Sequence, residues 1–596
     1  MYKIKGLSKH LFTKGKADWF IFIPLFILGL YLSNEINFVH RAGGALPEIQ
    51  SDKADYYIYL PATFIYGWDI HKIPRKFETR SPGIHFDYNR NKISTKTTCG
   101  VAIMWAPFFL VTHLIAIHWD PHPDGFSPFY ERMTILPGVF YLILGLFFLR
   151  RFLSRYFSRT VSYITVILLF AGTNLFYYGI DEGLMSHVNS FFLFCLFLFL
   201  LKKFIDSENK SYWLIVGISL VFALAVLIRP TNIILLTWMA FLDVRSFNEL
   251  KTRFLLFLKP LYIITFFIAA FIVFLPQFIY WKYLTGHLFY YSYTGESFTH
   301  LQNPQILSVW FAPLNGFFLY TPLALFFIVG IFQMIMKKQP NGIFIGIFFL
   351  FISYLFSSWC SWFFGGSFGY RPFVEFYALL AIPFAWFIST IPKMKNLYIR
   401  MMVVLLIAAS VWYNQKLTWN QRWNTSSTWA WDDYLLYLDY AGLYNSPRTT
   451  YLYKKDFENN ALEKINTQTK HYRSPTVGGV IYKSDNLTVF FKRDLSGILK
   501  YPVSKITASL WIHPGELKRT GLVFLVNCSD WQNKSYFYKQ FFVDDFIKGP
   551  DQWTKVYGTI DLPDTLNQQG LSCSVALWNI QKQSNIYFDD LRLLFQ

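Results

Sequence analysis

The sequence predicts an α-helical polytopic membrane protein that ends in an all-β domain. Of its 596 residues, 54% are hydrophobic and only 15% are charged, a composition too apolar for an ordinary soluble chain of this length. The apolar residues come in runs of about 18–20 as far as Ala409, and runs of this length match the ~30 Å hydrocarbon thickness of a bilayer. Beyond about 471 the pattern changes to short β-rich runs between turn residues.

Basic residues set the number and direction of the predicted spans. Because Lys and Arg gather in cytoplasmic loops, an even number of crossings should separate consecutive basic clusters. The clusters are the N-terminus, 150–159, 202–203, 245–259, 337–338 and 393–400. This rule gives about 11 spans, at 17–33, 131–149, 160–178, 188–204, 211–228, 230–243, 260–280, 318–336, 341–359, 373–390 and 399–415. Cytoplasmic loops therefore explain the net charge of +19 better than a nucleic-acid partner does.

The apolar run 99–118 is predicted not to span. A third crossing before Arg150 would place that basic cluster outside the cytoplasm. The run also contains Pro107, His113 and His118. We therefore expect an interfacial or re-entrant helix on the outer face. The alternative is that 99–118 spans and that one cluster breaks the rule.

A helical hairpin is predicted at 212–242. One straight helix would place Arg229 deep in lipid, at a cost of several kcal/mol, and would put Lys203 and Arg245 on opposite sides. Two short helices solve both problems. Pro230 then starts the second helix, where its missing N–H costs nothing, and Arg229 lies at the outer face.

The odd number of spans places the N-terminus in the cytoplasm and the C-terminal domain outside. The outer loops are then 34–130, 179–187, 281–317 and 360–372. Few Gly and many Phe, Ile, Lys and Asn residues indicate an AT-rich bacterial source. We therefore expect a multi-pass protein of a bacterial inner (plasma) membrane, with a periplasmic C-terminal domain.

The predicted domains are a membrane domain at 1–415, a polar connector at 416–470 and a β domain at 471–596. The expected strands are 487–493, 503–512, 521–528, 535–543, 552–560, 572–579 and 586–594. Spacing of this kind is typical of a β-sandwich or jelly roll. Cys528 and Cys573 both lie in this domain, where a disulfide could form in an oxidising compartment.

Acidic residues lie in two of the predicted outer loops. Asp52 and Asp55 follow the first span and lead into an aromatic run that begins at Tyr56. The short loop 179–187 carries Glu182 and ends at His187. Two carboxylate sites at helix mouths could converge on one pocket, whereas each alone would be an ordinary solvated charge.

These features resemble the plan of the polytopic glycosyltransferases of the GT-C type, which include the protein O-mannosyltransferases and the aminoarabinose transferases of lipid A. The resemblance covers about 1–415, and Asp52 matches the family's acidic residue before a Tyr-containing helix. Arg229-Pro230 matches a basic residue before Pro at a short hairpin, and 365–371 (GGSFGYR) matches a glycine-rich segment before a late span. The segment 315–322 (NGFFLYTP) is similar to another element of the family, with Asn315 where His is usual.

The C-terminal segments 552–556 and 586–591 resemble the galactose-binding-like sandwiches of carbohydrate-binding modules. This second resemblance implies a jelly-roll domain that either binds sugar or serves as a structural cap.

The first resemblance implies a glycosyltransferase that moves a hexosyl or pentosyl group from a polyprenyl-phosphate donor to a protein, lipid or glycan acceptor in the membrane's outer face. Inverting transfer needs a general base, and the match assigns this role to Asp52. Position 53 carries Lys where the family has Glu, so the second carboxylate is missing or is supplied by Asp55. Glu182 and His187 would orient the acceptor or hold a divalent cation, the one cofactor that stays open.

The donor phosphate would be stabilised by Arg229 and Arg371, because a guanidinium is a forked and permanently charged donor. The glycines at 365, 366 and 369 would let backbone N–H groups approach the phosphate. Tyr56, His187 and Glu375 complete the expected substrate-binding residues. Glu375 could instead pair with Arg371, four residues earlier.

A multi-span transporter of a glycan or a lipid-linked substrate is the alternative function. It would carry paired broken helices in two repeated halves, with charges at mid-span. The sequence shows one broken run, at Arg229-Pro230, and its candidate acids lie at helix mouths.

The predicted topology can be tested in the loop 122–127. A single cysteine placed there, in a variant without the native cysteines, should react with a membrane-impermeant reagent added from outside the cell. Protection from that reagent, with labelling from the cytoplasmic side, would mean that 99–118 spans the membrane.

Overall fold

The computed structural model divides the chain into two compact units, Met1–Thr418 and Trp419–Gln596. It describes residues 16–39, 48–81, 83–293, 295–365, 367–421, 431–443, 451–455, 467–468, 478–481, 487–494, 505–515, 517, 520–529, 535–547, 549–550, 552–561, 572–579 and 586–595. The basic start of the chain and much of the range predicted as a connector lie outside the described residues.

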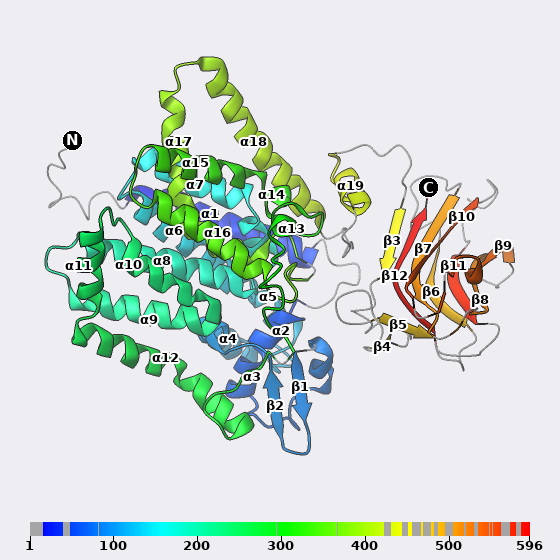
Figure 1. Cartoon of the computed structure of the whole chain (residues 1–596). Coiled ribbons are helices and arrows are strands. Elements are labelled where there is room, and N and C mark those ends of the chain that lie inside the picture. The colour runs from blue at the N-terminus through cyan, green and yellow to red at the C-terminus, as the bar shows by residue number, and fades with distance from the viewer. Residues whose placement is uncertain are drawn as a thin grey trace. The chain divides into compact units, whose positions relative to one another are not determined.

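The first unit is a bundle of apolar helices with short helices at its ends (Figure 1). The long elements are α1 (Lys16–Asn34), α4 (Gly100–Trp119), α6 (Ile135–Leu153), α7 (Arg159–Gly172), α8 (Ser186–Asp206), α9 (Tyr212–Ile228), α12 (Pro260–Thr285), α15 (Leu325–Met336), α16 (Gly342–Ser357), α17 (Tyr377–Thr390) and α18 (Leu397–Asn420). The short helices are α2 (Asp52–Tyr57), α3 (Tyr59–Phe64), α5 (Pro128–Met133), α10 (Leu236–Phe241), α11 (Phe247–Phe257), α13 (Ile306–Phe311) and α14 (Phe317–Tyr320). Turns of 3-10 or π type include η3 (Tyr177–Asp181), η4 (Pro230–Leu235) and η6 (Arg371–Phe373).

The helices confirm the predicted fold class. Every range predicted to span contains a helix. Among the described residues, six helical stretches are long and apolar enough to cross a membrane, and further apolar helices have 10–17 residues. Breaks at polar or proline positions shorten the helices of 10–17 residues, as the break between α9 and α10 shows.

The range 212–242 folds back on itself. Pro230 opens a 3-10 turn directly after α9. At the start of α8, His187 contacts Arg229, whereas near the end of α8 Lys202 donates to Asp243 at 2.8 Å. Positions 229 and 243 therefore lie near opposite ends of one helix, which is the predicted hairpin.

The chain on either side of helix α4, which covers the run 99–118, contacts the region of α3. Before α4, the backbone oxygen of Thr97 accepts from the hydroxyl of Tyr59 at 2.7 Å. After α4, the backbone oxygen of Asp124 accepts from the hydroxyl of Tyr66 at 2.8 Å. Helix α4 itself is long and apolar enough to cross a membrane, so the interfacial placement of the run 99–118 stays a prediction.

Small residues let the helices of the bundle approach closely. A Cβ atom added at Gly330 of α15 would lie 2.0 Å from the backbone oxygen of Pro383 in α17. A Cβ added at Gly138 of α6 would lie 2.7 Å from the Cα of Gly183. These glycines are therefore contact points of the packing, as in other membrane helix pairs.

The short elements α2 and α3 and a hairpin of β1 (Ile84–Asp87) and β2 (Lys92–Thr95) gather at one end of α8 and α9, and α11 lies at the other end (Figure 1). The polar side chains that the sequence singled out are carried by this first group and by the loops around it.

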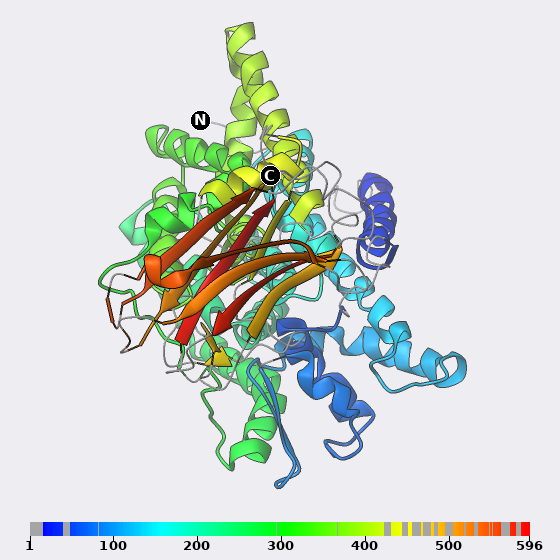
Figure 2. The same ribbon diagram turned by 90° about the vertical axis from the view of Figure 1, so that its right-hand side faces the viewer.

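The second unit is a pair of antiparallel sheets (Figure 2). One sheet has the order β10-β7-β12-β5-β4 with β3 paired to β12, and the other has the order β6-β11-β8-β9. The strands are β3 (Tyr451–Lys455), β4 (Thr467–Gln468), β5 (Gly478–Ile481), β6 (Leu487–Asp494), β7 (Lys505–His513), β8 (Leu522–Ser529), β9 (Ser535–Phe542), β10 (Thr554–Asp561), β11 (Ser572–Asn579) and β12 (Ile586–Phe595). A helix, α19 (Trp431–Tyr440), precedes them.

A shared apolar core joins the two sheets and confirms the predicted sandwich. Side chains of β7 alternate between buried and half-buried, and its buried Leu510 belongs to one core cluster with Phe524, Val575 and Phe588 from β8, β11 and β12. All seven predicted strands are present. Strands β3 and β4 lie within 416–470, so the sheet also draws on the range predicted as a connector.

Cys528 and Cys573 lie opposite each other on the neighbouring strands β8 and β11. Both are buried, and both are free thiols in this structure. The pairing of strands thus places the two sulfur-bearing residues side by side, while the disulfide itself stays a prediction.

The close approach at Gly330 can be tested by adding one methyl group. Gly330→Ala should lower the melting temperature of the purified protein, because overpacking against a backbone atom costs about 1–3 kcal/mol. The control is Gly217→Ala in α9, where the added Cβ meets one side-chain atom at 3.5 Å. A Gly330→Ala variant as stable as Gly217→Ala would contradict this account of the α15–α17 contact.

Candidate functional site

The first acidic residue of the predicted site opens helix α2. Asp52 follows Ser51, whose φ of 54° lies in the left-handed region, and the Ser51 N–H donates to the backbone oxygen of Arg80 at 2.8 Å. The α2 residues Lys53, Asp55 and Tyr56 are buried, whereas the side chain of Asp52 is 43% exposed. Asp52 is thus the carboxylate of α2 that a substrate can reach.

Asp52 pairs with Arg371, which lies 319 residues further along the chain. The Arg371 Nη1 atom donates to Asp52 Oδ2 at 3.3 Å. Burial alone would lower the pKa of the Arg371 guanidinium, but Asp52, Tyr178 and Tyr56 raise it above its ordinary value. Arg371 therefore stays charged and has further N–H groups with which it can bind an anion.

The glycine-rich segment 365–371 brings Arg371 to this place. Gly365 and Gly369 have φ values of +67° and +61°, which L side chains rarely adopt. A Cβ added at Gly369 would lie 3.1 Å from Tyr320 Cβ and 3.3 Å from Asn174 Nδ2. Gly366 lies outside the described residues, so its predicted backbone contact to phosphate stays a prediction.

A second group joins Arg229, His187 and Glu375. The Nδ1 atom of His187 lies 3.0 Å from Glu375 Oε2, and Arg229 Nη1 lies 2.9 Å from this Nδ1 atom and 3.2 Å from Nε2 of the same ring. Glu375 Oε1 lies 3.5 Å from the same Arg229 nitrogen. The Nδ1 atom therefore lies within hydrogen-bond distance of both the carboxylate and the guanidinium. Buried Glu375 and His187 thus fix the guanidinium of Arg229, which remains partly exposed.

The alternative pairing of Glu375 with Arg371 is not among the ion pairs of the described residues. The reason is local: 371–373 forms the 3-10 turn η6 and α17 starts at Tyr377, so no continuous α-helix stacks the two side chains. Each partner instead meets a residue from another part of the chain.

Tyr56 lies between the two groups. Its hydroxyl donates to Ser186 Oγ at 3.1 Å. Burial, with a further contribution from Asp52, raises the pKa of Tyr56 to about 12, although Arg229 and Arg371 act in the opposite direction. The phenol therefore stays protonated near neutral pH, and its neighbours place it beside both arginines and Asp52.

Glu182 belongs to a third group around Lys53. The Lys53 Nζ atom lies 2.8 Å from Glu48 Oε1 and 2.9 Å from Glu182 Oε2. Burial disfavours the charged ammonium, but the two carboxylates outweigh it and raise the pKa of Lys53. The sequence analysis singled out Glu182 but missed Glu48 and the role of Lys53. A signal for Lys53 was present, because the resembled family has Glu at this position.

Asp55 points to a different neighbourhood. It is buried, it hydrogen-bonds Ser81, and a Cβ added at Gly83 would lie 2.0 Å from its Oδ2 atom. Its Oδ1 atom has no hydrogen-bond partner among the described residues. Burial raises the pKa of Asp55 to about 7, with Asp52 adding to the rise while Ser81 and Lys96 oppose it.

Tyr293, in the predicted outer loop 281–317, is a further neighbour that the sequence did not indicate. Burial raises its pKa, Tyr56 and Asp52 add to the rise, and Arg229 opposes it. The Lys96 Nζ atom lies 5.0 Å from the centre of its ring. Nothing in the local sequence distinguishes Tyr293 from the other tyrosines of that loop.

No group of three or more His, Cys, Asp or Glu side chains able to hold a metal ion occurs within the described residues. Asp52, Glu182 and Glu375 each face a cationic side chain of the protein instead. The site as built is an array of ion pairs.

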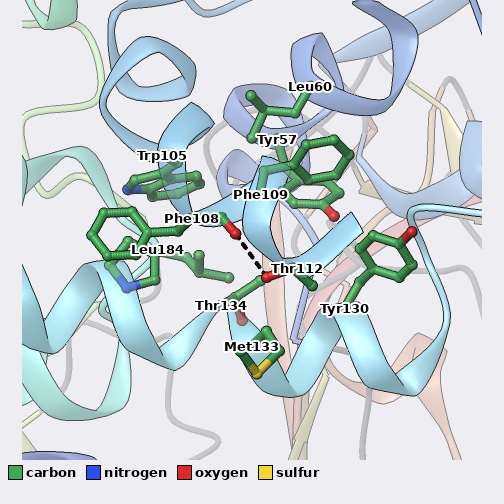
Figure 3. A pocket seen from close by; sticks show the side chains of 11 residues that line it. Tyr57, Leu60, Trp105, Phe108, Phe109, Thr112, Tyr130, Met133, Thr134 and Leu184 are labelled. Carbon is green, nitrogen blue, oxygen red and sulfur yellow. Dashed lines mark hydrogen bonds between the residues drawn. The ribbon is translucent and has the colours of Figure 1, made fainter. Parts of the chain in front are cut away.

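An apolar pocket is lined in part by Tyr57 of α2 (Figure 3). Its eleven lining residues are Tyr57, Leu60, Trp105, Phe108, Phe109, Thr112, Tyr130, Met133, Thr134, Pro137 and Leu184. None of these lining residues carries a formal charge, so the pocket is apolar.

No family model and no curated protein matches the chain. Solved structures do match. One is the oligosaccharyltransferase AglB of Archaeoglobus fulgidus in complex with an inhibitory peptide and a dolichol-phosphate, at 13% identity over 72% of this chain and 58% of that chain, with a TM-score of 0.41. Another is ArnT of Cupriavidus metallidurans bound to undecaprenyl phosphate, at 10% identity over 68% of this chain and 71% of that chain, with a TM-score of 0.39.

Both of these proteins are glycosyltransferases of the GT-C type, the class that the sequence motifs resemble. The chain spans less than two thirds of the AglB chain. A third match is the CBM22-1 xylan-binding domain of Xyn10C from Paenibacillus barcinonensis, at 10% identity over 25% of this chain and 96% of that domain, with a TM-score of 0.18. At these scores the likeness is distant, and the residues of the site carry the functional conclusion.

The pKa of Asp55 gives a stability prediction with a definite sign. Folding raises this pKa from about 3.9 to about 7, so the folded state holds a proton that the unfolded chain loses. Stability should therefore fall as pH rises from about 4 to about 7. Asp55→Asn should melt at a higher temperature than the wild type at pH 8, and the difference should shrink towards pH 5. A constant difference across this range, measured by thermal unfolding, would contradict the assignment.

Proposed function

We propose that the first unit is a glycosyltransferase that moves a sugar from a polyprenyl-phosphate donor to an acceptor hydroxyl, with inversion. One observation carries this proposal: a half-exposed carboxylate, Asp52, lies 3.3 Å from the arginine Arg371, beside a second, fixed arginine, Arg229. A base next to two permanent cations matches a reaction in which a hydroxyl loses a proton while a phosphate leaves.

In the proposed step, the acceptor oxygen attacks the anomeric carbon as the bond from that carbon to the phosphate oxygen breaks. Asp52 takes the proton of the acceptor hydroxyl. The electron pair of the broken bond stays on the polyprenyl phosphate, which leaves as an anion. One bond to the anomeric carbon forms and one breaks on the opposite face, so the configuration inverts.

The two arginines stabilise the charge that develops on the phosphate. Preorganised cations in a partly dry site act more strongly than in water. Glu375 and His187 hold Arg229 in place, so it needs little reorganisation when the phosphate arrives. Arg371 shares its guanidinium between Asp52 and the phosphate, which sets the distance between the base and the leaving group.

The arrangement favours an enzyme over a transporter. The charged residues meet where α8 begins, α9 ends and α2 starts, which is one end of the bundle. A transporter site would lie near the midplane, between two broken helices.

We place this end of the bundle at the periplasmic face of a bacterial inner membrane. The acceptor is then a protein, a lipid or a glycan outside the cytoplasm. Tyr56, and Glu182 as the partner of Lys53 next to Asp52 in the sequence, would contact either the acceptor or the transferred sugar. Asp55, buried against Ser81, is proposed to support α2 and not to share the proton transfer.

The proposal predicts a specific loss of activity. Purified protein in lipid, supplied with radiolabelled polyprenyl-phosphate sugars and an extract containing acceptors, should consume one donor. Asp52→Asn should lower the rate by about 100-fold or more, because a general base contributes at least that much. Asp69→Asn removes a surface carboxylate that pairs with Lys72 and should leave the rate unchanged. Normal turnover by well-folded Asp52→Asn would overturn the assignment of the base.

A further inference from the structure

Lys53 holds its ammonium group between two carboxylates. Its ammonium lies between two carboxylates from different parts of the chain, 2.8 Å from Glu48 and 2.9 Å from Glu182. The side chains of Lys53 and Glu48 are 10% and 4% exposed, and that of Glu182 is 20% exposed. An inward-facing positive charge between two carboxylate oxygens is the arrangement that a metal ion would otherwise provide.

The other acids of the site are paired in the same way. Asp52 faces Arg371, and Glu375 faces Arg229 and His187. A divalent ion such as Mg²⁺ or Mn²⁺ binds through several oxygen ligands, usually carboxylates and waters. Asp52, Glu182 and Glu375 thus already face side-chain cations, whereas Asp55 of α2 is buried and its Oδ1 atom has no hydrogen-bond partner among the described residues.

We infer that Lys53 replaces a divalent cation in this site. It neutralises Glu48 and Glu182, holds the side chain of Glu182 in place, and lets sugar transfer proceed without added metal. Lys53 is thus a positioning residue, since it acts through Glu182. The statement about transfer rests on the proposed function, whereas the statement that Lys53 fills a cation site does not.

If the inference holds, the residue at position 53 decides whether the site holds a lysine ammonium or a bound divalent metal ion. Replacing Lys53 by Glu would place three carboxylates, at 48, 53 and 182, around the space that the ammonium fills. Hard divalent cations prefer such an oxygen set. Lys53→Gln would keep hydrogen-bond donors and remove the charge, leaving two carboxylates without their cation.

The experiment has two readouts, melting temperature with and without Mn²⁺, and transfer with EDTA and with Mn²⁺. We expect wild-type transfer to change less than about twofold in EDTA, and its melting temperature to be unaffected by Mn²⁺. Lys53→Glu should melt at a higher temperature with Mn²⁺, and its transfer should rise by about tenfold or more on addition of Mn²⁺. If Lys53→Glu folds only with Mn²⁺ present, that result also supports the inference. Lys53→Gln is then the variant that is compared with the wild type in metal-free buffer.

The chain offers a matched control near the other end of α8. Lys202 Nζ lies 2.8 Å from both Asp206 Oδ1 and Asp243 Oδ2, so it too bridges two carboxylates. Lys202→Glu should gain stabilisation by Mn²⁺ without making transfer depend on Mn²⁺. This control separates the creation of any metal site from the creation of one that serves the reaction.

Two results would overturn the inference. One is a wild type that loses transfer by about tenfold or more in EDTA and regains it with Mn²⁺. The other is a folded Lys53→Glu variant whose melting temperature ignores Mn²⁺. If the wild type consumes no donor under any condition, the proposed function fails, and the melting temperatures still decide whether Lys53 fills a cation site.

Discussion

The cost of placing a charge among hydrocarbon is the constraint on which this structure depends. A helix that must be apolar along its length can carry polar side chains only near its ends or at a break. In the first unit, α8 begins at Ser186, α9 ends before Arg229, and α2 begins at Asp52. The charged residues of the candidate site lie at or near these helix ends, and the ion pair of Asp52 with Arg371 joins the first short helix to a segment 319 residues away.

Pairing makes this concentration of charge tolerable. An unpaired buried charge would cost several kcal/mol, and removing one partner of a buried pair is strongly destabilising. Glu375, which is fully buried, is matched by Arg229 and hydrogen-bonded to His187. The same pairing prepares the site for chemistry, because groups that are already fixed need not reorganise when a phosphate arrives. Stability and the proposed function thus use the same contacts.

Much of the fold could be predicted because long apolar runs and alternating strands leave direct signals in the sequence. The hairpin at Arg229-Pro230 followed from the cost of a charge in lipid together with the parity of the basic clusters. Strands β3, β4 and β5 were missed because such short stretches carry too little periodicity, and the pairing of β3 with β12 and of β4 with β5 is a tertiary effect.

The site was predicted as a set of residues and not as a set of contacts. The spacing of Arg371 and Glu375 indicated a helical ion pair, but a 3-10 turn at 371–373 separates them. Asp55 was grouped with Asp52 by proximity in sequence, although it is buried against Ser81. The bridge from Lys53 to Glu48 and Glu182 depends on how three segments fold together, and local spacing carries no record of the link from Lys53 to Glu182.

The central claim is that Arg371 and Arg229 receive the phosphate of a polyprenyl-linked donor beside Asp52. The most direct measurement is an experimental structure of the wild-type protein in lipid with polyprenyl phosphate bound. The account predicts the phosphate within hydrogen-bond distance of both guanidinium groups, with its leaving oxygen facing Asp52. The account would be contradicted by a phosphate bound elsewhere, with the Asp52–Arg371 ion pair unchanged and only solvent beside it.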